Sequence, residues 1–181
     1  TDPGAVYQGR QDKNDNLRMA LAVGQILSED GVDVGYTRVQ DVYQSPLQKA
    51  QMANNWEADY FVSFHRNAMP VPGTASGTES LIFSRGGEAE QLASNINAEL
   101  GQAGWNDLGT TERPGLIVLR KTEMPAVLVE VGFLDNPEDN QRFDEHFEHT
   151  ARAIADGILN TLRTPEGQPE YYQIQVGAYA D

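Results

Sequence analysis

The sequence contains no cysteine among its 181 residues. Disulfides, a thiol nucleophile and a thiolate zinc site are therefore excluded, and any zinc site must use histidine and carboxylate ligands. Basic residues are also scarce, because 13 lysines and arginines stand against 27 acidic residues and give a formal net charge of −14. A surface this acidic repels phosphate backbones and anionic membranes, so the composition predicts no nucleic-acid partner.

Long hydrophobic runs are absent as well. No stretch approaches the roughly 18 consecutive apolar residues of a membrane span, so no transmembrane segment is predicted. Residues 1–5 show neither the basic leader nor the apolar core of a secretory signal, and the sequence does not begin with Met. We therefore expect the natural start of the protein to lie upstream of Thr1. An acidic, cysteine-free protein suits the exterior of a bacterium, although many cytosolic proteins share this composition.

Helical periodicity alternates with short apolar runs along most of the chain. Helices are predicted from apolar spacing and capping signals over residues 17–27, 46–54, 88–100 and 145–162. Strands are predicted from short apolar or alternating runs over residues 32–36, 60–64, 78–84, 116–119 and 126–131. A further turn or helix is expected after Asn136. This alternation predicts an α/β fold, with a mostly parallel, twisted sheet and helices on both faces.

The end of the chain differs in character from the rest. Residues 164–170 are rich in proline, glycine and polar side chains, which is typical of a linker. Residues 171–181 then alternate as one strand, and a lone strand is not stable by itself. We therefore expect a main domain over residues 1–163, a linker, and the first strand of a second domain.

Two ionisable side chains stand out against buried strands. His65 closes the apolar run 61–64, and ligands in open α/β sheets collect at such strand ends. A hydrogen-bonded histidine at a strand end is the ordinary alternative, but the polar pair 66–67 favours a lined cleft. Glu130 interrupts the apolar run 127–131, where a carboxylate is costly to bury unless it is paired, metal-bound or protonated. A solvent-facing strand position is the alternative for Glu130. Two such groups from separate strands indicate a metal-assisted hydrolase.

Other candidate residues give weaker signals. Glu79 opens a strand, and an edge position and a cleft position are equally compatible with it. Asp12 precedes the first helix, where a carboxylate usually serves only the helix dipole or cap. His146 and His149 share a helical spacing that could chelate a metal, but their acidic neighbours favour a solvated surface.

Several segments, in their order along the chain, resemble the catalytic domain of zinc-dependent N-acetylmuramoyl-L-alanine amidases, which cut bacterial peptidoglycan. The resemblance runs from Thr1 to about Leu162, so it covers nearly the whole chain. It is carried by residues 1–5, 9–17, 37–38, 53–54, 58–59, 63–67, 77–79, 119–120, 125–133 and 136.

This resemblance implies a zinc ion held by two histidines and a glutamate, with a second glutamate as catalytic acid and base. His65 matches the second histidine ligand and Glu130 matches the catalytic glutamate. Asp12 stands where the family has its ligand glutamate, and the first histidine belongs just upstream of Thr1. The residues assigned to the substrate groove are Asn67, Glu79 and Arg120.

The chain departs from the family pattern at two ligands. Aspartate reaches about 1.5 Å less far than glutamate, and the upstream histidine is not part of the sequence. We therefore expect residues 1–181 to bind zinc weakly and to have little activity, and we expect the first strand of the sheet to be missing. Residues 171–181 resemble the opening strand of a sporulation-related repeat (SPOR) domain, which binds glycan strands lacking stem peptides.

Three functional hypotheses follow. The first is a monomeric, extracellular or wall-associated bacterial hydrolase that cleaves the amide bond between N-acetylmuramic acid and L-alanine by a zinc-activated water. The second is an amidase-like protein that binds cell wall without cleaving it. The third is a glycosidase that uses Glu79 and Glu130 as paired carboxylates, whose spacing would then have to match that of known glycosidases.

Overall fold

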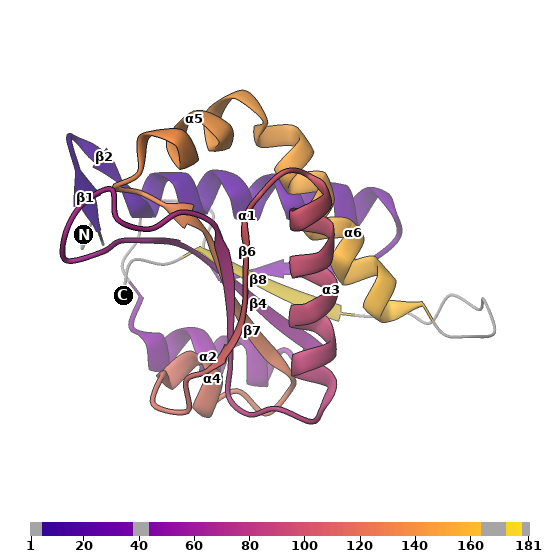
Figure 1. The fold of residues 1–181 in the computed structure, drawn as a ribbon. Coiled ribbons are helices and arrows are strands. Elements are labelled where there is room, and N and C mark those ends of the chain that lie inside the picture. The colour runs from indigo at the N-terminus through magenta and orange to yellow at the C-terminus, as the bar shows by residue number, and fades with distance from the viewer. Residues whose placement is uncertain (1–4, 38–43, 164–172, 179–181) are drawn as a thin grey trace.

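The computed structural model describes residues 5–37, 44–163 and 173–178. In this part of the chain a six-stranded sheet has helices on both faces (Figure 1). In spatial order its strands are β3 (Asp33–Tyr36), β8 (Gln173–Ala178), β4 (Tyr60–Asn67), β7 (Ala126–Phe133), β5 (Thr78–Ile82) and β6 (Asp107–Glu112). Neighbouring strands are parallel except β5 and β7, which are antiparallel. The mostly parallel sheet predicted from the sequence is therefore confirmed.

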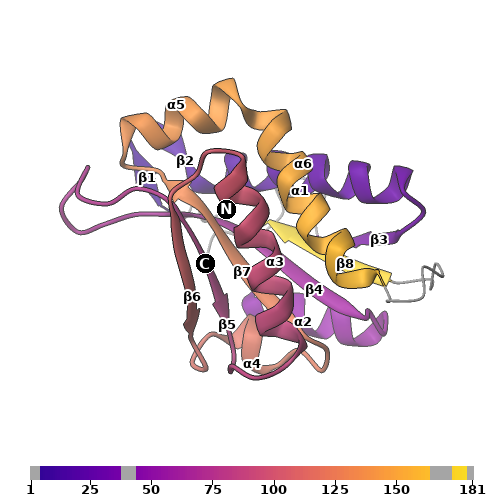
Figure 2. The same cartoon turned by 45° about the vertical axis from the view of Figure 1, so that its right-hand side comes forward.

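Helices cover the sheet unevenly (Figures 1 and 2). One face carries α1 (Asp12–Glu29), α3 (Glu88–Gln102) and α6 (Phe147–Leu162), and the other carries α2 (Pro46–Asn55) and the short α4 (Ile117–Arg120). Helix α5 (Pro137–Glu145) follows the end of β7, and the hairpin of β1 (Val6–Tyr7) and β2 (Arg10–Gln11) precedes α1. Within the described residues, no helix is both long enough and apolar enough to cross a membrane.

Strand β4 shows how the sheet divides its side chains between two cores. Val62 and Phe64 are fully buried in the larger core, whereas Phe61 is fully buried in the smaller one. Because successive strand residues face opposite sides, the larger core lies against α1, α3 and α6 and the smaller one against α2 and α4. By the same alternation His65 projects to the side of α2 and α4, and Arg66 projects to the side of α1 and α6.

Capping signals in the sequence locate two helix starts correctly. The Oγ of Ser45 accepts a hydrogen bond from the Gln48 backbone N–H at 3.2 Å, and the Gln48 Oε1 accepts one from the Ser45 N–H at 2.8 Å. This is the predicted capping box, with Pro46 in the first turn. Asn136 opens α5, because its side chain accepts hydrogen bonds from the first backbone N–H groups of that helix.

The prediction of a strand over residues 116–119 was wrong. This segment forms α4, whose Val118 and Leu119 are buried in the smaller core while Ile117 is exposed. A run of four apolar residues does not distinguish a buried strand from one turn of helix, so tertiary packing decides. Strand β6 was missed because its residues are mostly polar and only partly buried, as expected at the edge of a sheet.

The last described segment of the chain forms part of the main sheet. Strand β8 lies inside the main sheet, parallel to both β3 and β4, and its Ile174 and Val176 are fully buried in the larger core. Pairing on both edges satisfies the strand's backbone groups, and its alternating apolar residues suit the sheet interior. The predicted linker over residues 164–170 lies outside the described residues. That residues 171–181 open a glycan-binding domain stays a prediction.

The placement of β8 has a measurable consequence for stability. We expect Ile174→Ala to lower the free energy of unfolding by about 2–4 kcal/mol, because it leaves a cavity in the larger core. The measurement is urea unfolding followed by circular dichroism. The exposed Leu108, truncated in the same way, should change the free energy by no more than about 0.5 kcal/mol. Equal, negligible effects of both substitutions would place residues 173–178 outside the cooperative unit.

Candidate active site

Three ionisable side chains lie in one row across neighbouring strands. His65 on β4 is the register partner of Glu130 on β7, and Glu130 is the register partner of Glu79 on β5. Side chains of register partners project from the same face, with their Cβ atoms about 5 Å apart. The smaller core, which includes Phe61 and Leu128, occupies the same face nearer to α2 and α4. The two residues that the sequence singled out on separate strands are therefore neighbours.

Asp12, the first residue of α1, lies beside this row. Its Oδ1 accepts hydrogen bonds from the Arg66 backbone N–H at 2.8 Å and from Asn16 Nδ2 at 2.6 Å. Its Oδ2 lies 3.9 Å from Nδ1 of His65. Asp12 is only 3% exposed and His65 7%, so the contact is shielded from solvent. The start of α1 thus brings a carboxylate to the end of β4.

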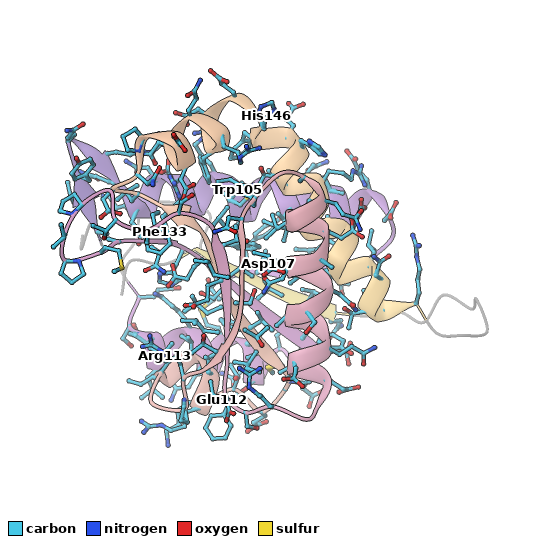
Figure 3. All side chains as sticks on the ribbon, in the orientation of Figure 1. Trp105, Asp107, Glu112, Arg113, Phe133 and His146 are labelled. Atoms are coloured by element: carbon cyan, nitrogen blue, oxygen red, sulfur yellow. The ribbon has the colours of Figure 1, made fainter. Side chains whose placement is uncertain are left out.

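Two of the residues assigned to the substrate groove are Glu79, which belongs to the row, and Asn67, which follows His65 two positions later on β4. Asn67 ends β4 as the register partner of Phe133, and its Oδ1 accepts a hydrogen bond from the Ala68 N–H at 3.0 Å. Figure 3 shows Phe133, which marks this end of β7. Glu79 is held by the Thr111 hydroxyl, which donates to its Oε2 at 3.2 Å.

Arg120 lies apart from the row. It is exposed at the end of α4 and lines a cleft of about 330 Å³ together with Phe83, Ser84 and Ala126. Ala126 stands four residues before Glu130, which corresponds to about 13 Å along the strand. The structure therefore does not bring Arg120 to His65 and Glu130.

The two remaining histidines do not contribute to the row. His146 and His149 are both exposed, and Figure 3 shows His146 at the outer edge of the molecule, where α5 meets α6. The interpretation of these residues as a solvated surface is confirmed.

Comparison with known proteins assigns a family to this arrangement. The profile of the N-acetylmuramoyl-L-alanine amidase family matches residues 1–160, which is most of the chain. The chain belongs to this family. The amidase match ends close to the last residue of α6 and leaves residues 161–181 outside the profile.

Individual amidases agree with the family match. The sporulation-specific N-acetylmuramoyl-L-alanine amidase of Bacillus subtilis is 33% identical over 186 residues, covering 99% of this chain and 71% of that protein. The crystal structure of an N-acetylmuramoyl-L-alanine amidase from Clostridium difficile 630 has a TM-score of 0.82 at 31% identity, covering 87% of each chain. The catalytic domain of the amidase CwlV from Bacillus (Paenibacillus) polymyxa has a TM-score of 0.81 at 32% identity, covering 92% of each chain. These likenesses confirm the predicted α/β fold and the amidase resemblance.

The side chains beside the row include ligand types that bind zinc, but within the described part of the chain only two such ligands lie close together. His65 Nδ1 and Asp12 Oδ2 are an imidazole nitrogen and a carboxylate oxygen, the ligand types that a cysteine-free zinc site needs. Two ligands of a tetrahedral zinc lie about 3.3–3.4 Å apart, so the observed 3.9 Å must shorten by about 0.5 Å. Among the described residues, no group of three or more histidine and carboxylate side chains is placed to hold a metal ion.

Sequence reasoning missed the side chain that holds Asp12 in place. Asn16 stands four residues after Asp12 on α1, so the two side chains lie on the same face of the helix and their hydrogen bond spans one turn. That spacing was visible in the sequence. The backbone donor from Arg66 was not, because it depends on how α1 packs against β4.

Burial gives Asp12 a distinct pH signature in the metal-free protein. Desolvation raises the pKa of its carboxyl from 3.8 to about 7, although the hydrogen bonds from Arg66 and Asn16 act in the opposite direction. The folded state thus holds this proton more tightly than the unfolded chain, so stability falls as the pH rises from about 4 to about 7. We expect the free energy of unfolding, measured in urea with a chelator present, to fall by about 2 kcal/mol between pH 5 and pH 7.5.

Asp12→Asn tests the source of this pH dependence. The amide oxygen still accepts hydrogen bonds from the Arg66 N–H and from Asn16, but the side chain no longer titrates. We expect this variant to lose most of the decline in stability between pH 5 and pH 7.5. An unchanged decline would assign it to other groups.

Proposed function

We propose that the protein hydrolyses the amide bond between N-acetylmuramic acid and the L-alanine of peptidoglycan stem peptides by zinc-dependent catalysis. The observation that supports this most is the pairing of His65 with Glu130 on neighbouring strands of an amidase-family fold. Asp12, 3.9 Å from His65, adds a second potential ligand at the same place.

In this proposal His65 and Asp12 bind the metal. Bound zinc would lower the pKa of a water molecule toward about 7 and polarise the scissile carbonyl. Asp12 Oδ1 already accepts two hydrogen bonds, and Oδ2 is the oxygen that lies 3.9 Å from His65 Nδ1, so Oδ2 would be the oxygen that binds a metal. The hydrogen bonds therefore select which oxygen is available as a ligand.

Glu130 acts as the general base and then as the general acid. It accepts a proton from the attacking water and delivers that proton to the departing amine of L-alanine. Glu130 is the one residue of β7 that is partly exposed, whereas the residues before and after it on this strand are buried.

Substrate contacts are assigned by distance from this row. We propose that Asn67 and Glu79, which lie near His65 and Glu130, contact the parts of the substrate next to the scissile amide. Arg120 would contact a part of the polymer about 13 Å away, because its cleft includes Ala126 at the start of β7.

The setting of the reaction follows from its substrate. Peptidoglycan lies outside the cytoplasm, so we propose that the protein acts at the bacterial cell wall. We further propose that it acts as a monomer. The proposal that residues 171–181 open a SPOR-like, glycan-binding domain is compatible with a family profile that ends at residue 160.

A wall-binding protein without catalysis is the second candidate. It is favoured by the lack, among residues 5–37, 44–163 and 173–178, of three side chains placed to hold a metal. It is also favoured by Asp12, whose side chain is shorter than the glutamate expected at this position. Such a protein would bind peptidoglycan without stoichiometric zinc.

Digestion of purified peptidoglycan separates the hypotheses. The protein, expressed at the length that its gene encodes, should release new alanine amino termini without new reducing sugars. A chelator should stop the release, and added zinc should restore it. Reducing sugars would instead indicate a glycosidase acting through Glu79 and Glu130, and the absence of both products would favour a wall binder.

A further inference from the structure

Arg66 follows His65 on β4 but projects to the opposite face of the sheet. Its side chain is 0% exposed. It therefore does not line a cleft beside His65, which is what the polar pair 66–67 predicted from the sequence. A guanidinium buried this deeply is costly unless its donors find acceptors, and here its three nitrogens each donate a hydrogen bond to one of two other elements.

The guanidinium of Arg66 joins β7 to α1. Its Nε donates to the carbonyl oxygen of Val131 at 2.6 Å and its Nη2 to that of Phe133 at 3.3 Å. Its Nη1 donates to Oδ2 of Asp15 at 2.9 Å. The group also lies over the ring of Phe143 on α5, with 4.4 Å between the guanidinium carbon and the ring centroid.

These contacts lie next to the candidate site residues along the chain. Val131 directly follows Glu130, and Asp15 stands one helical turn after Asp12. The backbone N–H of Arg66 itself holds Asp12 Oδ1 at 2.8 Å. One residue therefore connects the three elements that carry His65, Glu130 and Asp12.

We infer that Arg66 is a positioning residue for the hydrolysis. Its guanidinium fixes the end of β7 against β4 and α1, and so sets where Glu130 stands relative to His65 and Asp12. The inference rests on the proposed function, because it assigns a role within the same site. Misplacing a catalytic group by about 1 Å can lower a rate about 100-fold, so the loss of this link should act mainly on kcat.

Arg10 on β2 provides a matched control for Arg66. Its Nε donates to Oδ2 of Asp15 at 2.7 Å, and its Nη2 donates to Oδ1 of Asp144 at 2.8 Å. It also lies over the Phe143 ring, at 5.3 Å from the centroid. Arg10 thus shares Asp15 and Phe143 with Arg66, but its side-chain hydrogen bonds run to α1 and α5 and not to β7.

The first test compares Arg66→Lys with Arg10→Lys in the protein at its gene-encoded length. Lysine keeps the charge but does not reproduce the forked hydrogen bonds. We expect Arg66→Lys to lower kcat on a soluble peptidoglycan fragment by about 30-fold, with KM within about threefold of the parent value. Arg10→Lys should change kcat by less than about threefold, even if its melting temperature falls by as much as that of Arg66→Lys. Equal losses of kcat in both variants would make Arg66 a merely structural residue and overturn the inference.

Hydrogen exchange of the metal-free proteins tests the same link without relying on catalysis. We expect Arg66→Lys to speed exchange at the amides of residues 130–134, and Arg10→Lys to leave those amides unchanged. If the parent protein cleaves no peptidoglycan, the proposed function fails and this comparison alone decides the role of Arg66. Exchange that rises equally in both variants, or only in α5, would overturn the inference.

A further variant covers the case in which Arg66→Lys does not fold. Asp15→Asn in the Arg10→Lys background changes the acceptor that Arg66 uses on α1. Both proteins in this comparison lack Arg10, which also donates to Asp15, so the difference between them reports on Arg66. Compared with Arg10→Lys alone, the double variant should show faster exchange at residues 12–16 and a lower kcat. Identical behaviour of the two proteins would count against the inference.

Discussion

Replacing Glu130 by glutamine should lower kcat for amide cleavage by about 1000-fold, within the 100- to 10,000-fold range of general acid–base catalysis. Glutamine keeps the size of the side chain but neither accepts nor delivers a proton at neutral pH. KM and zinc content should change little, because Glu130 is not assigned to metal binding. The measurement is the rate at which alanine amino termini appear in purified peptidoglycan treated with the protein at its gene-encoded length.

Glu79→Gln is the matched control for this prediction. Glu79 is the register partner of Glu130 on β5 and is likewise partly buried, and its Oε2 accepts a hydrogen bond from the Thr111 hydroxyl. We expect its substitution to lower kcat by less than about tenfold. Losses of similar size in the two variants would point to a pair of catalytic carboxylates, and full activity of Glu130→Gln would remove Glu130 from its assigned role.

The second large effect concerns the metal. We expect His65→Ala to lower zinc affinity by about 100-fold or more, because even outer-shell substitutions cost 10- to 100-fold. His65 is buried beside Asp12, and the described residues offer no other imidazole near this carboxylate. Competition titration with a chromophoric chelator measures the affinity, and metal analysis measures the stoichiometry.

His149→Ala distinguishes this site from adventitious binding by surface histidines. His149 is exposed on α6 and stands three residues after the exposed His146. Its substitution should leave zinc affinity within about twofold of the parent value. A loss in His149→Ala with no loss in His65→Ala would move the metal site to the helix surface and contradict the assignment of His65.

The main elements of the fold could be predicted because their sequence signals are local. Strands β4 and β7 are runs buried on both faces, and α2 and α5 begin at residues whose side chains cap the backbone. Helix α4 and strand β6 could not be predicted in the same way. The four apolar residues 116–119 fit either structure, and the polar strand β6 is recognisable only once β5 lies beside it.

The sequence predicted the central pair of the candidate site, His65 and Glu130, but not the positions of Arg120 and Arg66. His65 and Glu130 stand out because each breaks an apolar strand, and their adjacency follows once β4 and β7 pair. The distance from Arg120 to this row depends on the path of the chain through α4, which no local pattern records. The inward orientation of Arg66 follows from strand alternation, but its partners Val131 and Asp15 come from elements that only the tertiary structure brings together.

The most direct test of this account is anomalous diffraction at the zinc absorption edge from crystals of the zinc-loaded protein at its gene-encoded length. The account predicts one strong peak about 2.0–2.2 Å from both His65 Nδ1 and Asp12 Oδ2, with Glu130 beside it but not bound to it. A peak at His146 and His149, or no peak beside His65, would contradict it.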